Sequence, residues 1–207
     1  MKLQVAIDRV SLTEAVDLAS QLNGQVDIIE MGTSLSKDYG NEAIRQLKEV
    51  LPDSQLLADI KTIDEGQYEF KQGFKYGADI LTVMGAASLA TIELCEKVTK
   101  EMNRTMMIDL LEVCESKIEE LQVFDSAIFC LHNSVDKEEK WSVVETVAAF
   151  KEAYPQVKRL AIAGGIDLSQ ARELKEQGLM EIIIVGSSIT KADDPVKEAE
   201  KFMEVIG

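Results

Sequence analysis

Asp59 and Lys61 form the strongest chemical signal in the sequence. They follow the apolar residues Leu57 and Ala58, and residues two apart on a strand point to the same side. Buried charges need partners, so the two residues could form a structural ion pair. The alternative is that they face a polar site, where clustered ionisable groups perform acid–base chemistry. Asp64 adds a second carboxylate, which we expect near the lysine, and we favour the active-site interpretation.

His132 is the only histidine in the chain and ends an apolar run. A lone histidine can be a hydrogen-bonded core residue, but imidazole is the side chain best suited to proton transfer near neutral pH. We favour a functional role because ionisable residues also end the other apolar runs. Cys130, two residues earlier, could pair with His132 as a nucleophile. We expect it instead one layer lower, in an apolar interior.

Three more carboxylates, those of Asp8, Glu30 and Asp109, also lie at or near the ends of apolar runs. Asp8 alone could equally be a turn or helix-capping residue. If these groups converge with Asp59, they repel one another. A hard cation such as Mg²⁺ would relieve that repulsion and polarise a substrate oxygen. Without a cation, Lys61 is the main counter-charge that we expect nearby.

Glycine-containing segments end the last two apolar runs, as Gly164-Gly165 and Gly186-Ser187. Glycine lets a backbone approach a ligand closely, and exposed N–H groups at helix starts bind phosphate. Tight turns between elements are the alternative interpretation. Because barrels often bind phosphate after their seventh and eighth strands, both segments together indicate a phosphate site.

The elements that carry these residues alternate in texture. Eight short apolar runs are separated by longer stretches of helical period, which predicts parallel strands joined by right-handed helical crossovers. Eight such units in 207 residues predict one α/β domain, a single (β/α)₈ TIM barrel spanning residues 1–207, with all strand ends on one face. An open doubly wound sheet is less favoured because the first turn lacks GxGxxG. The predicted strands are Leu3–Asp8, Val26–Glu30, Gln55–Ile60, Asp79–Met84, Thr105–Leu110, Ser126–His132, Lys158–Ala163 and Glu181–Gly186.

Two helices are indicated most clearly by their apolar faces and start signals. The last helix is expected to begin at Asp193-Asp194-Pro195, because an acidic cap followed by proline is typical of a first turn. Glycines at 24, 77 and 178 fall where helices should end. The predicted buried faces are Leu12, Ala15, Val16, Ala19 and Leu22 in the first helix, and Val196, Ala199, Met203 and Ile206 in the last.

Composition limits the possible partners and location. A net charge of −15 is a poor match for nucleic acid, although a local pocket can carry the opposite sign. No apolar run approaches a membrane span, and the N-terminus lacks a signal-peptide core, so we expect a cytoplasmic protein that binds no membrane. Cys95, Cys114 and Cys130 are widely spaced and odd in number, which indicates reduced thiols.

The segments that carry these residues resemble a known family. LQVAID, VDIIEMGT, LLADIKTIDEG, GADILTVMG, MMIDLLEV, AIAGGID and VGSSITKADDP are similar to the 3-hexulose-6-phosphate synthases. More broadly they resemble the orotidine-5′-monophosphate decarboxylase superfamily, which also includes the 3-keto-L-gulonate-6-phosphate decarboxylases. The likeness covers essentially the whole chain. Its most specific element is DxKxxD, formed by Asp59, Lys61 and Asp64.

The resemblance implies a Mg²⁺-dependent aldolase, a lyase that condenses ribulose 5-phosphate with formaldehyde to 3-hexulose 6-phosphate through an enediolate. It also implies a homodimer in which Asp64 reaches into the neighbouring site. The remaining implied roles are metal binding by Glu30 and Asp59, charge support by Lys61, acid–base catalysis by His132, contacts to substrate hydroxyls by Asp8 and Asp109, and phosphate binding by Gly164, Gly165, Gly186 and Ser187.

Two other functions stay open at this point. The decarboxylases carry arginine three residues after the histidine, where this chain has Val135, and usually a glutamate in place of Asp109. Both differences favour the synthase, yet the residues after His132 depart from the HTG…QAAG pattern of the synthases as well. That loop leaves room for a non-catalytic sugar-phosphate-binding barrel. We favour it least, because binding alone gives no reason for Asp59, Lys61 and His132 to converge.

Overall fold

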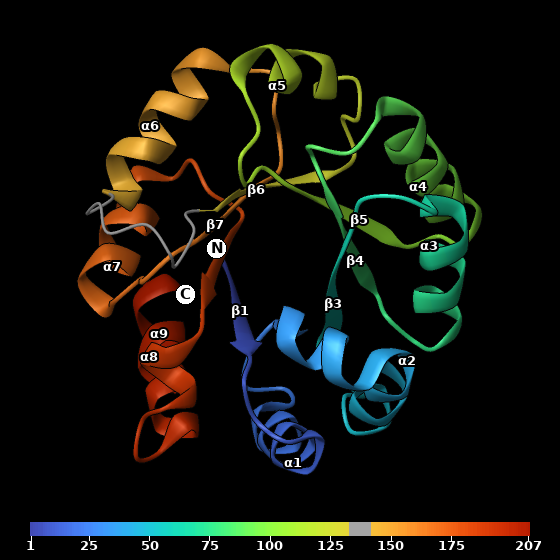
Figure 1. Cartoon of the computed structure of the whole chain (residues 1–207). Coiled ribbons are helices and arrows are strands. Elements are labelled where there is room, and N and C mark those ends of the chain that lie inside the picture. The colour runs from blue at the N-terminus through green and yellow to red at the C-terminus, as the bar shows by residue number, and fades with distance from the viewer. Residues whose placement is uncertain (133–141) are drawn as a thin grey trace.

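The chain folds into a closed barrel of parallel strands. The computed structural model describes residues 1–132 and 142–207, and within these ranges eight strands pair in sequence order, with β1 returning to pair with β8. Figure 1 shows the helices arranged around the strands. The strands are β1 (Lys2–Ile7), β2 (Ile28–Met31), β3 (Gln55–Thr62), β4 (Ile80–Met84), β5 (Thr105–Asp109), β6 (Ile128–His132), β7 (Leu160–Ala163) and β8 (Ile182–Val185).

The predicted TIM barrel is confirmed, and pairing of β1 with β8 excludes an open sheet. Every predicted strand is present, and no strand end differs by more than two residues. In the described parts of the chain, no helix is long and apolar enough to cross a membrane. The helices are α1 (Leu12–Leu22), α2 (Thr33–Glu49), α3 (Gly66–Lys75), α4 (Leu89–Glu101), α5 (Glu115–Leu121), α6 (Val143–Ala153), α7 (Leu168–Gln177), α8 (Ser187–Thr190) and α9 (Pro195–Ile206).

Local sequence explains where the first helix begins. Ser11 and Glu14 form a capping box, in which the Ser11 hydroxyl accepts a hydrogen bond from the Glu14 N–H and the Glu14 carboxylate accepts one from the Ser11 N–H. The helix then buries Ala15, Ala19 and Leu22, which is the face that the periodicity predicts.

The last helix begins as predicted but buries a slightly different face. The Asp194 carboxylate accepts a hydrogen bond from the Lys197 N–H, and Pro195 occupies the first turn. Ala199 and Ile206 are buried as expected. Phe202, which the predicted stripe omits, is the largest side chain of that buried face.

Two apolar layers hold the barrel. Outward-pointing strand residues pack against the helices, and inward-pointing residues fill the interior. Cys130 lies in the interior layer, 4% exposed, as expected. Burial raises the pKa of the Cys130 thiol well above its ordinary value, so the thiol stays protonated and is a poor nucleophile. The interior residues are Ile28, Leu57, Ile80, Met107, Ile128, Cys130, Ala161, Ile182 and Ile184.

Candidate active site

The carboxyl ends of four successive strands bring the central polar side chains together. Asp59 and Lys61 come from the end of β3, Asp109 is the last residue of β5, and His132 is the last residue of β6. Thr82 lies on β4, between them. Because all strands of the barrel are parallel, these ends share one face, where TIM-barrel enzymes carry their active sites.

Asp109 links Lys61 to His132 through a single oxygen. The Lys61 Nζ donates to the Asp109 Oδ2, and the His132 Nδ1 lies 3.0 Å from that same oxygen. The other oxygen of Asp109, Oδ1, accepts a 2.9 Å hydrogen bond from the Leu111 N–H. The Lys61 Nζ also lies 3.3 Å from the Asp59 Oδ2. The structure therefore joins these four ionisable groups in one chain of contacts.

These contacts fix the charges of Asp109 and Lys61. Burial alone would raise the pKa of Asp109, but hydrogen bonds and charge from His132 and Lys61 lower it to about 2. Burial alone would lower the pKa of Lys61, but Asp59 and Asp109 raise it above its ordinary value. At neutral pH Asp109 is therefore a carboxylate and Lys61 an ammonium. An ionised carboxylate only accepts hydrogen bonds, so the Nδ1 of His132 donates and Nε2 is the basic nitrogen of the neutral ring.

Asp59 and Lys61 lie in a bulge rather than in a regular strand. Between the pairs Ala58–Leu81 and Thr62–Val83, β3 advances four positions while β4 advances two. Lys61 adopts a left-handed backbone with φ 49°, which is uncommon for a residue with a side chain. The expected ion pair between Asp59 and Lys61 is present. Because Asp109 links it to His132, the pair is part of a polar site and not an isolated structural ion pair.

Glu30 is buried at the end of β2, beside Gln4 of β1. The Gln4 Nε2 donates a 2.6 Å hydrogen bond to the Glu30 Oε2, and the Oε1 of Gln4 is buried without a partner among the described residues. Burial, followed by repulsion from Asp59, raises the pKa of Glu30 to about 8 in the absence of a cation. The protein therefore holds a buried carboxylate whose ionisation is opposed by a second one nearby.

The Glu30–Asp59 pair fits a hard cation. Carboxylate oxygens are the donors that Mg²⁺ prefers, and Mg²⁺ is usually held by one or two carboxylates with water and substrate completing its shell. No cluster of three or more His, Cys, Asp or Glu side chains suited to a metal is present in the described part of the chain. If a cation binds here, Glu30 and Asp59 would be its ligands from the protein, and water and substrate would fill the remaining positions.

Asp8 lies at the end of β1 and contacts the start of α2. Its Oδ1 accepts hydrogen bonds from the Ser34 N–H at 3.0 Å and from the Ser34 hydroxyl at 2.7 Å. Asp8 thus caps a helix, as one interpretation of the sequence held, while its contact with substrate stays a prediction. Gly32 leaves room for this carboxylate, because a Cβ atom at position 32 would lie 2.0 Å from the Asp8 Oδ2 and would force the Asp8 side chain to move.

The glycine segments form exposed turns at the same face of the barrel. Gly165 has φ 64°, and a Cβ there would meet nothing within 4 Å, so its backbone conformation rather than space favours glycine. Gly186 precedes α8, a helix of four residues that begins at Ser187. Both interpretations of these segments remain compatible with the geometry, and phosphate binding by Gly164, Gly165, Gly186 and Ser187 stays a prediction.

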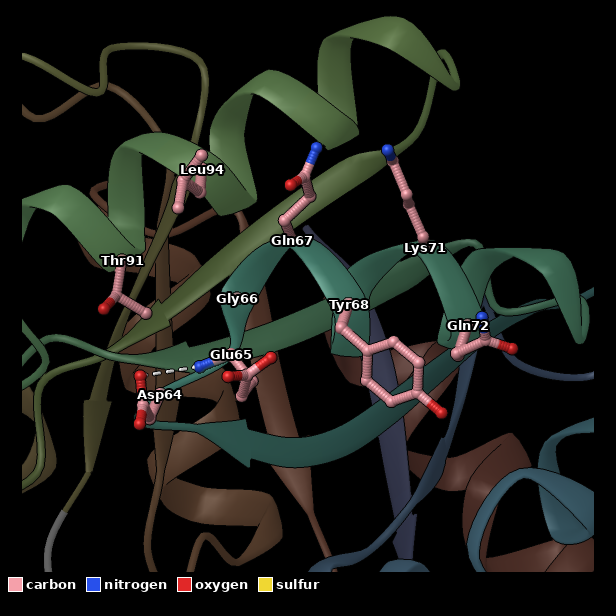
Figure 2. Close-up of a pocket in the computed structure, with 9 residues that line it drawn as sticks. All are labelled: Asp64, Glu65, Gly66, Gln67, Tyr68, Lys71, Gln72, Thr91 and Leu94. Atoms are coloured by element: carbon pink, nitrogen blue, oxygen red, sulfur yellow. Dashed lines mark hydrogen bonds between the residues drawn. The ribbon is translucent and has the colours of Figure 1, made fainter.

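The sequence-based expectation that Asp64 lies near Lys61 stays a prediction. Among the residues that the structure describes, Lys61 pairs with Asp59 and Asp109, and Asp64 forms no ion pair with it. The bulge turns Lys61 towards β5, whereas Asp64 is exposed and its Oδ1 accepts a 2.8 Å hydrogen bond from the Glu65 N–H. Figure 2 shows Asp64 at the edge of a cavity beside α3 and α4.

Three polar contacts of the site were not predicted from the sequence. The Thr33 and Thr82 hydroxyls donate to Asp59, at 2.5 Å to Oδ2 and 2.8 Å to Oδ1, and Gln4 donates to Glu30. The two-residue alternation of side chains along a strand could have indicated two of these residues, since Gln4 and Thr82 occupy inward positions. Val135 and the rest of the loop 133–141 lie outside the described residues.

At the ends of the barrel strands, contacts join Asp59, Lys61, Asp109 and His132, and together the barrel and these residues define a TIM-barrel enzyme. Comparison with known proteins assigns this enzyme to the lyases. The profile of the orotidine 5′-phosphate decarboxylase / HUMPS family matches residues 1–202. The 3-hexulose-6-phosphate synthase of Bacillus subtilis is 33% identical over 209 residues, covering 100% of this chain and 99% of that protein. The chain therefore belongs to the orotidine 5′-phosphate decarboxylase / HUMPS family.

Solved structures agree with this assignment. The 3-hexulose-6-phosphate synthase from Salmonella typhimurium superimposes with a TM-score of 0.91 at 31% identity, covering 100% of this chain and 98% of that one. The 3-keto-L-gulonate-6-phosphate decarboxylase from Vibrio cholerae superimposes with a TM-score of 0.85 at 28% identity, covering 99% and 96%. A synthase and a decarboxylase, the two kinds of enzyme named in the sequence analysis, thus both have structures similar to this chain.

Proposed function

We propose that this lyase is a Mg²⁺-dependent aldolase that condenses ribulose 5-phosphate with formaldehyde to give 3-hexulose 6-phosphate. The observation that carries the proposal is the shared oxygen of Asp109, which holds the base His132 and the cation Lys61 side by side. Such a pair suits a reaction that removes a proton and stabilises the negative charge left behind. Full-length similarity to two 3-hexulose-6-phosphate synthases supports the choice of substrates.

His132 is the base in the proposed reaction. Its Nε2 takes a proton from C1 of ribulose 5-phosphate, the carbon next to the carbonyl, and the electron pair of the broken C–H bond gives an enediolate. C1 then attacks the carbon of formaldehyde, a C–C bond forms, and the formaldehyde oxygen takes the proton from the His132 imidazolium. Asp109 stabilises that imidazolium through Nδ1, so the base keeps one orientation through both transfers.

Lys61 stabilises the negative charge of the enediolate. Its ammonium is kept charged by Asp59 and Asp109, so no proton has to move before it can act. Mg²⁺, when bound by Glu30 and Asp59, supplies Lewis-acid polarisation of the carbonyl and adjacent hydroxyl oxygens of the substrate. Asp8 and Asp109 are proposed to contact substrate hydroxyls.

The glycine turns are proposed to hold the substrate phosphate. Gly164 and Gly165 follow β7, which pairs with the strand of His132, and Gly186 and Ser187 follow β8, the next strand of the barrel. The Gly164, Gly165 and Ser187 positions are exposed to solvent and therefore accessible to a dianion. Binding there would hold the far end of the sugar and fix C1 relative to His132.

A second copy of the chain is the proposed partner at the Asp64 surface. The cavity beside Asp64 measures about 410 Å³, and Figure 2 shows Tyr68 of α3 and Leu94 of α4 at its rim. Three large apolar side chains are exposed in this region, Ile63 at 56%, Tyr68 at 62% and Leu94 at 41%. Grouped exposed apolar side chains are typical of interaction surfaces, and a homodimer would place Asp64 in the neighbouring site.

A paired assay tests the reaction. Purified enzyme is mixed with ribulose 5-phosphate, formaldehyde and Mg²⁺, and separately with 3-keto-L-gulonate 6-phosphate and Mg²⁺. We expect formaldehyde to be consumed and 3-hexulose 6-phosphate to form. Release of CO₂ that exceeds the aldol activity would replace the proposal with the decarboxylase. Binding of ribulose 5-phosphate without turnover of either substrate would indicate a sugar-phosphate-binding barrel.

A further inference from the structure

We propose that Thr82 is a positioning residue that sets where Asp59 and Lys61 point. The inference rests on the proposed function, since it concerns the side chains assigned to the cation and to the enediolate. Thr82 lies on β4, is 3% exposed, and contacts both residues through one hydroxyl group.

The Thr82 hydroxyl makes one hydrogen bond in each direction. Its Oγ1 accepts a 2.9 Å hydrogen bond from the Lys61 backbone N–H and donates a 2.8 Å hydrogen bond to the Asp59 Oδ1. A hydroxyl has a single proton, so donation to Asp59 leaves only lone pairs for the Lys61 N–H. The two contacts are thus mutually consistent, and each fixes the direction of the other.

The bulge explains why such a group is needed. The shift in register between β3 and β4 removes the ladder pairing expected for Asp59 to Lys61, and Lys61 takes a left-handed backbone conformation. A buried N–H without a partner destabilises the folded state, so the side chain of Thr82 takes the place of a β4 carbonyl. The hydroxyl therefore holds in place the bend that turns Lys61 towards Asp109.

The same hydroxyl divides the oxygens of Asp59 between two tasks. Oδ1 is occupied by Thr82, while Oδ2 lies 3.3 Å from the Lys61 Nζ and accepts a hydrogen bond from Thr33. Oδ2 thus carries the contacts with Lys61 and Thr33, whereas Oδ1 accepts one hydrogen bond from the described residues, so Oδ1 is the oxygen that we assign to the cation. Without Thr82, the Asp59 carboxylate keeps the contacts of Oδ2 with Thr33 and Lys61 but loses the hydrogen bond that fixes Oδ1.

The test compares four variants. Thr82→Val removes the hydroxyl and keeps the shape, Thr82→Ser keeps the hydroxyl and removes the methyl group, and Thr82→Ala replaces the valine variant if that variant fails to fold. Thr62→Val is the matched control, because Thr62 is also buried on β3 beside the bulge, but its hydroxyl donates to Glu69 of α3 and not to the site. The readouts are Mg²⁺ affinity by calorimetry without substrate, kcat and KM.

We expect Thr82→Val to weaken Mg²⁺ binding and lower kcat by about 10- to 100-fold each, as loss of a group that orients a metal ligand typically does, while KM for ribulose 5-phosphate changes by less than about threefold. Thr82→Ser should restore affinity and kcat to within about threefold of the wild type. Thr62→Val should lower the melting temperature and leave Mg²⁺ affinity and kcat unchanged.

Two outcomes overturn the proposal. One is a Thr82→Val enzyme with wild-type Mg²⁺ affinity and kcat. The other is a Thr82→Ser enzyme as impaired as Thr82→Val, because packing of the methyl group would then explain the effect. If the wild type consumes no formaldehyde, the proposed reaction fails on its own, and the Mg²⁺ titration of the same variants still decides the role of Thr82.

Discussion

The imidazole of His132 meets the carboxylate of Asp109 through Nδ1 and Oδ2, 3.0 Å apart. Since the pKa of Asp109 is lowered to about 2, the carboxylate is ionised at neutral pH, and the proton of this contact belongs to the imidazole. The neutral ring therefore carries its proton on Nδ1. This orientation leaves Nε2 as the base that the proposed reaction needs.

The tautomer of His132 can be measured directly, because the chain contains only one histidine. In ¹⁵N NMR spectra the neutral form of the imidazole should be protonated at Nδ1 and not at Nε2. Asp109→Asn should weaken this preference and lower kcat by about 10²- to 10⁴-fold, the range over which a positioned proton-transfer group contributes. A wild-type spectrum showing a proton on Nε2 would remove His132 from the role of base.

Asp109 should also shape the acid stability of the fold. Its pKa is lowered from 3.8 to about 2, so its stabilising effect is complete above about pH 4 and is lost as the pH falls through 2. The difference in free energy of unfolding between wild type and Asp109→Asn should therefore shrink by about 2 kcal/mol between about pH 4 and about pH 2. Urea unfolding at several pH values measures it.

The control for this measurement is Asp17→Asn, which alters an exposed carboxylate of α1. Its difference from the wild type should stay nearly constant over the same pH range. If the Asp109→Asn difference were equally flat, the contacts from Lys61 and His132 would not hold Asp109 in its ionised form.

Asp59→Asn should remove the response to Mg²⁺. At a concentration about 100 times its dissociation constant, Mg²⁺ should raise the melting temperature of the wild type by about 5–10 °C, because binding to the folded state alone adds about 2.7 kcal/mol. The variant should show neither this rise nor Mg²⁺-dependent turnover. Asp53→Asn, an exposed residue before β3, should behave as the wild type. Retained Mg²⁺-dependent turnover in Asp59→Asn rejects the assignment of Asp59 to the metal.

The position of Asp64 can be tested by mixing two inactive variants. Asp64→Asn and His132→Gln subunits are co-expressed with different tags. If Asp64 acts in the neighbouring site of a homodimer, each hybrid dimer regains one intact site, and random pairing restores about one quarter of the wild-type activity. Each variant expressed alone should remain inactive. No recovery in isolated hybrids would place Asp64 in the site of its own subunit, whereas an active Asp64→Asn variant would place it outside the chemistry.

Much of the site could be predicted because strand ends are visible in the sequence. The apolar runs before Asp109 and His132 place both residues at the carboxyl end of a parallel strand, and the closed barrel makes those ends neighbours. The face of α1 follows from helical periodicity alone. Phe202 of α9 was missed because the apolar residues of this helix fit several overlapping helical spacings. The predicted buried face followed one of them, and packing against the barrel selected another.

The contacts around Asp59 could not be predicted in the same way. They depend on the bulge in β3, and a change of register results from pairing with β4 rather than from the residues of β3 alone. The bulge explains why Lys61 pairs with Asp109, a contact that was not predicted from the sequence. It also explains one contact of Thr82, whose hydroxyl accepts a hydrogen bond from the Lys61 N–H because that N–H lies outside the ladder.

Positions 8 and 32 should change together in evolution. A Cβ at Gly32 would take the space of the Asp8 carboxylate, and any larger residue would displace that carboxylate from Ser34. A mutation at position 32 alone therefore lowers the stability of the fold, whereas the same mutation can leave stability unchanged once position 8 holds a smaller side chain. The order in which mutations arise thus matters for this pair. In a library randomised at both positions and selected for folded protein, glycine at 32 should accompany aspartate at 8. Other residues at 32 should accompany alanine, serine or glycine at 8.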